Sequence, residues 1–220
     1  FLHPSAGLWD GEALMPRFPY RFPMVSEAQS VARHFLTADP DRLTHVHSAA
    51  RIAELSADAL GLDDPEALIA AAWLHDIGYV EALARTGFHP LDGALYLADA
   101  GWPDRVVLLV AHHSHASVHA RYYGVENQME VLDRPPMDAE DVLTFADLTS
   151  GLTGMGATPR QRIAEMRVRH GAAASPVPAR VREARYRLLL NAATRVTAAL
   201  SGHSSRGTPR QRFQSTEARH

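Results

Sequence analysis

The chain has 220 residues, of which 46% are hydrophobic, and a formal net charge of −3, which indicates one sizeable folded core. It contains no cysteine and no lysine, so disulfides, thiol nucleophiles, cysteine-bound zinc, Schiff bases and the phosphate-binding lysine of P-loop enzymes are excluded. The 13 histidines, the carboxylates, the hydroxyls and the arginines remain for chemistry, and this set favours a metal held by nitrogen and oxygen.

Charge is unevenly distributed along the chain. Residues 1–150 hold 22 acidic residues against 9 arginines, a net −13, whereas residues 151–220 hold 3 acidic residues against 13 arginines, a net +10. We expect the basic C-terminal part to pack as helices on an acidic body. A basic segment also attracts polyanions, but the acidic body would repel them, which argues against nucleic acid as a partner.

The sequence also bears on location and on the N-terminal arm. No apolar run reaches the length of a membrane span, and the N-terminal residues lack the charged-then-apolar order of a signal peptide. We therefore expect a cytoplasmic protein without membrane contact. Residues 1–23 are rich in proline and aromatic residues without periodicity, and we expect them to form an extended arm.

The first two predicted helices precede residue 61. The first covers about residues 27–37 and ends at the break formed by residues 39–41, Asp-Pro-Asp. The second covers about residues 41–60, with apolar residues at helical spacing, His47 at the edge of that stripe, and Gly61 as a stop.

The most apolar stretch covers residues 67–76 and follows an acidic, proline-containing helix start at residues 63–66. It carries no charge until Asp76, which predicts a helix buried on nearly every side. A buried carboxylate needs a partner, and the neighbouring His75 offers a second ligand, so we expect a metal ion there. We expect Gly78 to end this helix with a left-handed cap.

The remaining segments complete an all-α prediction. Helices are expected over residues 90–101 and 103–111, the second leading into His112 and His113, and then over residues 138–149, 159–170 and about 178–200. Residues 114–136 are predicted to be a loop around a short helix, a candidate substrate loop. No segment alternates with period two, so no strand is expected. The predicted organisation is one helical domain over residues 24–155, a C-terminal helical extension over 156–201 that packs on it, and a disordered tail over 202–220.

Four helical positions offer metal ligands, namely His47, His75, Asp76 and Asp147. Two imidazoles and two carboxylates leave open positions in an octahedral shell, which suits Mn, Fe, Co, Ni or Mg better than a closed structural zinc. A divalent metal with an open position activates water and polarises a substrate oxygen, which is what hydrolysis of a phosphate ester requires.

The order of these ligands resembles the HD-domain superfamily. The motifs are His-Ser-Ala-Ala-Arg-Ile-Ala at residues 47–53, Leu-His-Asp-Ile-Gly at 74–78 and Phe-Ala-Asp at 145–147, within a similar region of about residues 34–150. The resemblance implies an HD-domain helical bundle and a metal-dependent phosphohydrolase that cleaves a small phosphate ester or nucleotide. The first motif favours His47 over His45, and Arg51, one turn after His47, would hold a phosphate or orient a carboxylate.

Some branches of the superfamily bind two ions. They carry one extra histidine in a turn before a helix and another in a His-His step at a helix end, and His89 and His112 occupy these places. Asp76 would then bridge the ions; alternatively, His89 and His112 would contact the substrate directly. A further alternative is that His113 is simply a core histidine with its nitrogens satisfied. We expect His115 and His119 to be solvated.

The chain departs from the family pattern after the His-Asp-Ile-Gly motif. Many relatives have lysine at the next position, and nucleotidase-like relatives with one metal have an acid there, where this chain has Tyr79. Glu81, two residues further on, could serve as the general acid for the leaving group or be a solvated side chain.

Two alternative functions remain open from the sequence. The first is a di-iron HD-type oxygenase, since some two-iron members of the superfamily are oxygenases. The second is a non-catalytic ligand-sensing or nucleic-acid-associated module that uses the arginine-rich C-terminal third. The expected partner in the leading hypothesis is a small phosphorylated substrate, and a homodimer could cover the apolar C-terminal helix.

Overall fold

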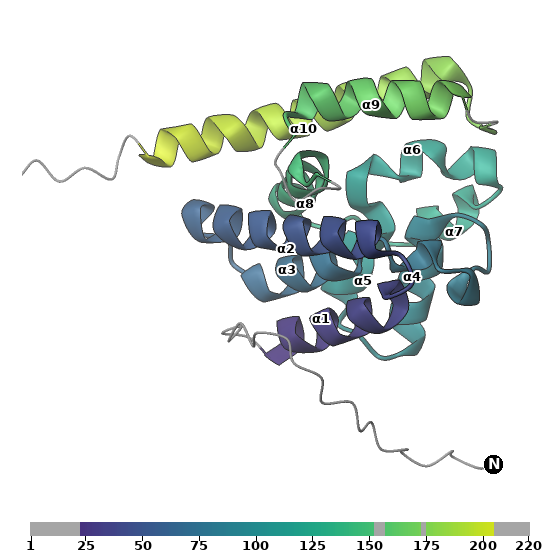
Figure 1. Ribbon diagram of the computed structural model, residues 1–220, viewed down its shortest axis with the longest axis horizontal. Coiled ribbons are helices and arrows are strands. Elements are labelled where there is room, and N and C mark those ends of the chain that lie inside the picture. Colours follow the sequence, from purple (N-terminus) through teal and green to yellow (C-terminus); the bar gives the residue numbers. More distant parts are fainter. Residues whose placement is uncertain (1–22, 152–156, 173–174, 205–220) are drawn as a thin grey trace, which may run out of the picture.

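The computed structural model describes residues 23–151, 157–172 and 175–204, and all regular structure within these ranges is helical (Figure 1). The all-α prediction is therefore confirmed for this part of the chain. Most of the predicted N-terminal arm and the predicted tail from residue 205 onward lie outside the described residues. The α-helices are α1 (Pro23–Leu36), α2 (Pro40–Leu60), α3 (Pro65–Leu74), α4 (His89–Asp99), α5 (Asp104–His112), α6 (Ser117–Ala120), α7 (Glu126–Glu130), α8 (Met137–Thr149), α9 (Pro159–Ala172) and α10 (Ala179–Ser204).

Short 3₁₀ helices connect several of these elements. They are η1 (Ile77–Tyr79), η2 (Glu81–Leu83), η3 (His113–His115) and η4 (Arg121–Tyr123). The predicted loop over residues 114–136 thus contains η3, α6, η4 and α7. None of the described helices is both long enough and apolar enough to cross a membrane.

Helix boundaries follow local capping signals. The side chain of Asp39 accepts a hydrogen bond from the backbone N–H of Arg42 at the start of α2, and Asp64 does the same for Ala67 at the start of α3. Gly61 ends α2 in the left-handed conformation, with φ of 64°. These boundaries match those expected from the sequence.

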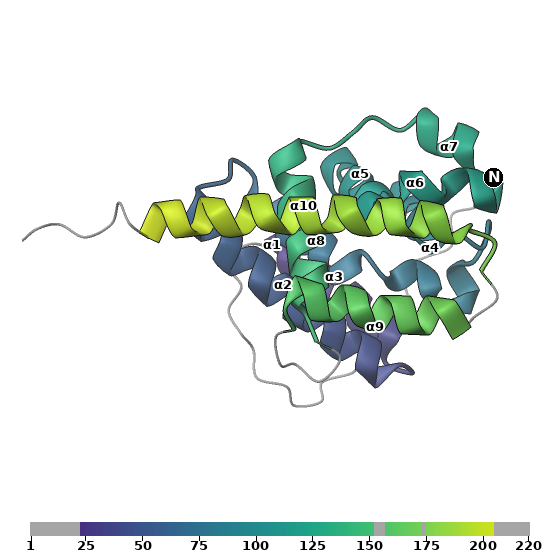
Figure 2. The ribbon, with the colours of Figure 1, turned by 90° about the horizontal axis from the view of Figure 1, so that it is seen from above.

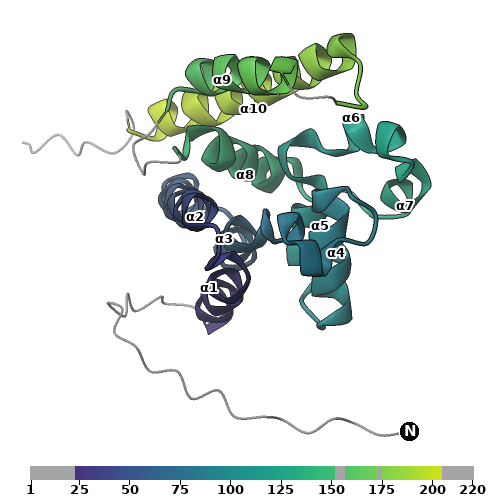
Figure 3. The same ribbon diagram turned by 45° about the vertical axis from the view of Figure 1, so that its right-hand side comes forward.

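Helix α3 is the centre of the core. Every residue from 67 to 74 is buried, and α1, α2, α5 and α8 pack around it (Figure 3). The fully buried helix that the sequence predicted is therefore confirmed, although it ends at Leu74 and His75 is its cap residue. His75 and Asp76 thus leave the helix at its C-terminal end, where they face the neighbouring elements.

Gly78 allows close packing rather than capping α3. It lies in η1 and is not among the glycines with positive φ, so the predicted left-handed cap is wrong. A Cβ atom at Gly78 would collide with the carbonyl oxygen of His89 and lie 2.6 Å from the backbone nitrogen of Gly93. Glycine therefore lets the start of α4 approach η1 closely, which brings His89 towards Asp76.

The C-terminal helices α9 and α10 lie together over α8 (Figures 1 and 2). A small separate apolar cluster holds them there, formed by Leu148, Ile163, Tyr186, Leu189 and Ala193. Arg195 on α10 adds a bidentate ion pair with the buried Asp141 on α8, with N–O distances of 2.6 and 2.7 Å. This packing agrees with a basic C-terminal part on an acidic body. Helix α10 continues to Ser204, past the predicted start of the tail.

Candidate metal centre

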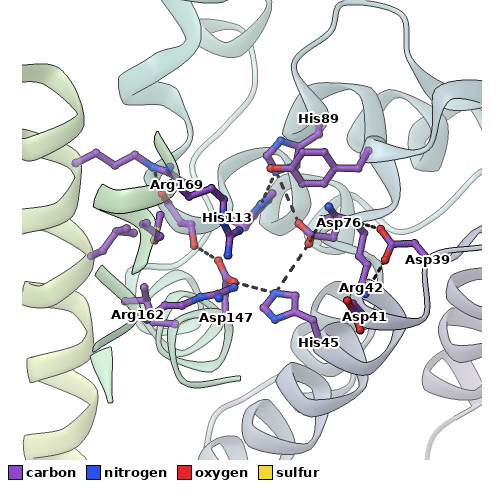
Figure 4. A pocket seen from close by; sticks show the side chains of 16 residues that line it. Asp39, Asp41, Arg42, His45, Asp76, His89, His113, Asp147, Arg162 and Arg169 are labelled. Atoms are coloured by element: carbon purple, nitrogen blue, oxygen red, sulfur yellow. Dashed lines mark hydrogen bonds and ion pairs between the residues drawn. The ribbon is translucent and has the colours of Figure 1, made fainter. Parts of the chain in front are cut away.

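Six side chains from five parts of the fold converge at the end of α3, and Figure 4 labels all of them except His75. Each offers an imidazole nitrogen or a carboxylate oxygen to a common space. They are His45 on α2, His75 and Asp76 after α3, His89 at the start of α4, His113 after α5, and Asp147 on α8.

The first group joins α2, α3 and α8. The Nε2 atom of His45 lies 3.1 Å from Oδ1 of Asp147 and 3.9 Å from Oδ2 of Asp76. The Nε2 atom of His75 lies 3.5 Å from Oδ1 of Asp76 and 3.8 Å from Oδ1 of Asp147. Two imidazoles and two carboxylates thus face one point, as one cation would require.

The second group shares Asp76 with the first. The Nε2 atom of His89 lies 3.8 Å from Oδ1 of Asp76 and 3.3 Å from Nε2 of His113. Ligand atoms of Asp76, His89 and His113 all lie within 4.8 Å of one another. The geometry thus offers two adjoining cation positions with Asp76 between them.

Backbone carbonyls fix the orientation of two rings. Nδ1 of His75 lies 2.9 Å from the carbonyl oxygen of Ala72, and Nδ1 of His113 lies 2.6 Å from that of Val110. Because a carbonyl only accepts, Nδ1 carries the proton in each ring and Nε2 presents a lone pair to the cluster. Nε2 of His75 is buried and makes no hydrogen bond with any residue that the structure describes.

Ser150 orients a third ring, that of His45. The hydroxyl of Ser150 donates to the carbonyl oxygen of Asp147 at 2.8 Å and lies 3.0 Å from Nδ1 of His45. The hydroxyl proton is thus used, so Ser150 accepts from Nδ1–H of His45, and Nε2 of His45 again faces the cluster. Three buried imidazoles held in this way, with a buried nitrogen left unbonded, fit a divalent metal.

The protonation states also suit a cation. Burial alone would raise the pKa of Asp76, but the neighbouring histidines and Arg42 outweigh burial and hold that pKa well below its usual range. Asp147 behaves likewise: burial opposes ionisation, but the hydrogen bond with His45 and the nearby histidines lower its pKa well below the usual value. Both carboxylates are therefore ionised at neutral pH.

The pKa values of the cluster histidines shift in different directions. Burial and the neighbouring His75 lower the pKa of His113 to about 4, so this ring is neutral at pH 7. Burial and His113 likewise hold the pKa of His89 well below its usual value. Burial would also lower the pKa of His45, but its hydrogen bond to Asp147 raises it, and this extra proton would be released when a cation binds.

The prediction that His47 is a ligand is wrong, because His45 occupies that place. His45 lies on the same face of α2 as the buried Ala49 and Ala53, whereas His47 is exposed on another face. The ring of His47 stacks on Trp73, with centroids 5.2 Å apart. The spacing of small residues on α2 was the signal that could have distinguished the two histidines.

The prediction that His112 faces the cluster is also wrong, and His113 does so instead. Nδ1 of His112 lies 2.9 Å from Nη1 of Arg134, outside the cavity. Helix α5 ends at His112, and the chain then turns so that Ser114 has a positive φ of 52°. This turn directs His113 inward. His115 and His119, expected to be solvated, are largely buried.

Two predicted catalytic residues lie away from the cluster. Arg51 is exposed on α2 and pairs with Glu54 on the same helix. Glu81 is exposed in η2 and does not line the cavity at the cluster. The faces of α2 and η2 that carry these side chains point to solvent, so neither residue reaches a substrate bound at the cluster.

Sequence reasoning missed Arg42, one turn before His45. Its Nη1 atom lies 2.7 Å from Oδ2 of Asp76, and its guanidinium carbon lies 3.9 Å from the centre of the Tyr79 ring. Helix α2 therefore places a cationic side chain next to Asp76 and Tyr79. The i, i+3 spacing of Arg42 and His45 on one face of α2 could have indicated it.

A connection through Ser114 was missed as well. The hydroxyl of Ser114 donates to Oδ2 of Asp147, and its carbonyl oxygen accepts a 2.7 Å hydrogen bond from Nε of Arg185 on α10. A non-glycine residue with positive φ is uncommon and has no signature in this sequence.

The cluster opens into a cavity of about 420 Å³. Figure 4 shows Arg162 and Arg169 on the α9 side of this cavity and Arg42 on the α2 side. Arg185 lines it as well, so four guanidinium groups surround the candidate metal ligands.

Comparison with known proteins gives one match. The sequence model of a family described as the HD domain matches residues 42–164, which is more than half of the chain. No curated protein and no solved structure matches the chain. The matched region holds all six residues of the cluster, whereas α10 lies beyond it. With the motif order, the helical fold and this match in agreement, the chain belongs to the HD domain family.

Proposed function

We propose that the protein is a metal-dependent phosphohydrolase that cleaves a small phosphate monoester or a nucleotide. One observation carries the proposal: two imidazoles with fixed Nδ1 atoms, those of His45 and His113, and the carboxylates of Asp76 and Asp147 line a cavity that four arginines also line. The cluster suits cations, and the cavity walls suit an anion. A phosphate ester bound against one or two divalent cations satisfies both.

The donor set suits Mn, Fe, Co, Ni or Mg, because its ligands are imidazole nitrogens and carboxylate oxygens. Bound at this cluster, such an ion supplies a water of lowered pKa and polarises a phosphoryl oxygen. Asp76 belongs to both ligand groups and would be their shared ligand. Arg42 hydrogen-bonds Asp76 and Asp39, so its part is to position Asp76.

The arginines of the C-terminal helices would bind the phosphate. Arg162 and Arg169 on α9 and Arg185 on α10 line the cavity that the cluster faces. A guanidinium group offers paired N–H donors that match phosphoryl oxygens, and it stays charged at all physiological pH values. These residues would therefore orient the phosphate and neutralise the charge that develops on it during hydrolysis.

A di-iron oxygenase is the second candidate, and the two ligand groups that share Asp76 are the observation that favours it. The arginine-lined cavity favours an anionic substrate and hence the hydrolase. The two reactions separate under anaerobic conditions. A hydrolase loaded with Mn²⁺ or Co²⁺ turns over without oxygen, whereas an oxygenase needs iron and consumes oxygen.

A nucleic-acid-associated module is a weaker candidate. Several arginines of α9 and α10 are engaged within the fold: Arg167 pairs with Glu183, and Arg195 pairs with Asp141. Other arginines of these two helices, namely Arg162, Arg169 and Arg185, line the cavity at the cluster. This leaves less basic charge for an outer nucleic-acid surface. A salt-dependent gel shift that disappears when residues 151–220 are deleted would favour this candidate over the hydrolase.

A phosphatase panel tests the proposal. Protein purified without chelator is assayed with nucleotides and sugar phosphates in the presence of Mn²⁺, Co²⁺, Ni²⁺ or Mg²⁺, and its metal content is measured. Asp76→Ala should lose both metal and activity. Glu81→Ala, which changes an exposed acid outside the cavity, should keep both. Absence of hydrolysis for every substrate and metal would refute the proposal.

A further inference from the structure

A second cavity, of about 380 Å³, adjoins the one at the cluster. The two cavities share Tyr79, His89 and Arg185 in their linings, so they meet at these side chains. Residues of the 78–92 segment, of η4 and of the segment before α10 form its walls. Its size lies within the range of about 300–1,000 Å³ that is usual for small-molecule sites.

Aromatic rings make up much of this second cavity. Tyr79, Phe88 and Tyr123 line it, and the rings of Phe88 and Tyr123 lie with centroids 4.9 Å apart. The ring of Tyr79 stacks on His89 at 3.7 Å and also carries the guanidinium group of Arg42 at 3.9 Å, so Tyr123, which is 38% exposed, offers the accessible ring surface. Such a surface suits a flat ring, which gains contact area and favourable ring–ring geometry at little cost in conformational freedom.

Two charged side chains in the walls are already engaged by the protein. The carboxylate of Asp92 accepts hydrogen bonds from the backbone N–H groups of Thr86 and Gly87 at 2.8 and 3.1 Å. Arg182 donates to the carbonyl oxygen of Val177. These two side chains therefore offer less to a ligand than the aromatic surfaces do, and His119 adds a further polar group to the lining.

Arg185 lies where the cavities meet. Its Nε atom donates to the carbonyl oxygen of Ser114, which holds the guanidinium group in place. The same group lines both cavities. It can therefore contact the phosphate of a ligand at the cluster while the rest of that ligand extends into the second cavity.

We propose that the second cavity binds the organic group of the substrate and that this group is a planar aromatic ring. The inference rests on the proposed function, because it takes the phosphate to lie at the cluster. It narrows the substrate class from phosphate esters in general to aryl or nucleobase-bearing phosphate monoesters. Tyr123 is then a specificity-determining residue, since it lines the second cavity and not the cavity at the cluster.

Binding of two phosphonates to the manganese-loaded protein tests the inference without catalysis. Phenylphosphonate and methylphosphonate share the anionic group and differ in the ring, and neither is hydrolysed. By calorimetry, phenylphosphonate should bind more tightly to the unmodified protein. Tyr123→Ala should reduce this preference about tenfold, as expected for the loss of one ring contact. Tyr122→Ala is the matched control, because Tyr122 lines neither cavity, and it should keep the preference.

The inference is overturned if the two phosphonates bind equally well, or if Tyr123→Ala leaves the preference unchanged. An equal loss in Tyr122→Ala and Tyr123→Ala also overturns it, since the effect would then come from η4 as a whole. If no phosphate ester is hydrolysed but the preference for phenylphosphonate depends on Tyr123, the subsite stands and the proposed hydrolase function fails.

Discussion

The Nε2 atom of His45 and the Oδ1 atom of Asp147 lie 3.1 Å apart, which joins α2 to α8 at the base of the cavity. Ser150 reinforces the link, because its hydroxyl bonds both the ring of His45 and the backbone of Asp147. The cluster therefore exists only when α2 and α8 pack together. A cation that binds it would stabilise this packing, since it binds the folded state and not the unfolded chain.

Replacement of His45 should remove the metal. His45→Ala deletes one imidazole of the first ligand group. Loss of a residue that merely orients a ligand costs about 10–100-fold in metal affinity, so loss of the ligand itself should cost at least about 100-fold. Titration of the metal-free protein with Mn²⁺ measures the affinity, and a phosphatase assay should show a parallel loss of activity.

His47→Ala provides the matched control two residues away. The ring of His47 packs on Trp73 at the surface, so its removal should cost only about 0.5–1.5 kcal/mol of stability and leave the metal affinity unchanged. If His47→Ala loses the metal and His45→Ala retains it, the placement of His45 in the cluster is incorrect.

The elements of the fold were predictable where local sequence determines them. Helix α3 is apolar on every side and has an Asp64 cap, so its burial follows from its own residues. The placement of Asp76 and Asp147 near one another follows from the order of the family motifs. Both predictions depend on short stretches of sequence and were therefore accessible before the structure.

The remaining site residues depend on tertiary packing. Which histidine of α2 faces inward is decided by the side of the helix that packs on α3 and α8. The choice of His113 over His112 depends on how the chain leaves α5. His113 has a non-helical ψ of 144°, Ser114 and His115 both have a positive φ of 52°, and no residue type in that stretch indicates this turn. Arg169 and Arg185 reach the cavity from helices whose position is set by the contact with α8, and no fixed spacing links them to the motifs.

Ser150 should tune the metal site without being a ligand. Ser150→Ala removes the acceptor for Nδ1–H of His45, so that ring loses its fixed orientation. Mn²⁺ affinity should fall about 10–100-fold while the fold is kept. Thr149→Ala is the control, because within the described part of the chain the hydroxyl of Thr149 donates to the carbonyl oxygen of Phe145 in its own helix. An equal fall in both variants would refute an orienting role for Ser150.

Gly78 should resist substitution even by alanine. A Cβ at this position meets the backbone of His89 and Gly93, which cannot move without shifting α4. Gly78→Ala should destabilise the protein by about 1–3 kcal/mol or more in urea unfolding, and it should lower metal affinity by displacing His89. Gly202→Ala, in α10 where no described atom lies within 4 Å of the added Cβ, should be neutral or slightly stabilising. Equal stability of both variants would contradict the close contact.

Glu140 should make a pH-dependent contribution to stability. Its side chain is buried on α8 and lies 3.1 Å from Nδ1 of His115. Burial would raise its pKa, but the close contact with His115 and the charge of Arg134 outweigh burial and lower it. A carboxylate with a lowered folded-state pKa stabilises the protein above its unfolded pKa of about 4.3, and this contribution is lost as the pH falls through the folded value. Glu140→Gln should therefore cost about 1–3 kcal/mol of stability at pH 7, and progressively less below about pH 4, in urea unfolding.

Glu130→Gln, at an exposed position, is the control and should change stability little at any pH. A cost for Glu140→Gln that stays constant from pH 7 to acid would show that packing, and not the charge of Glu140, is responsible.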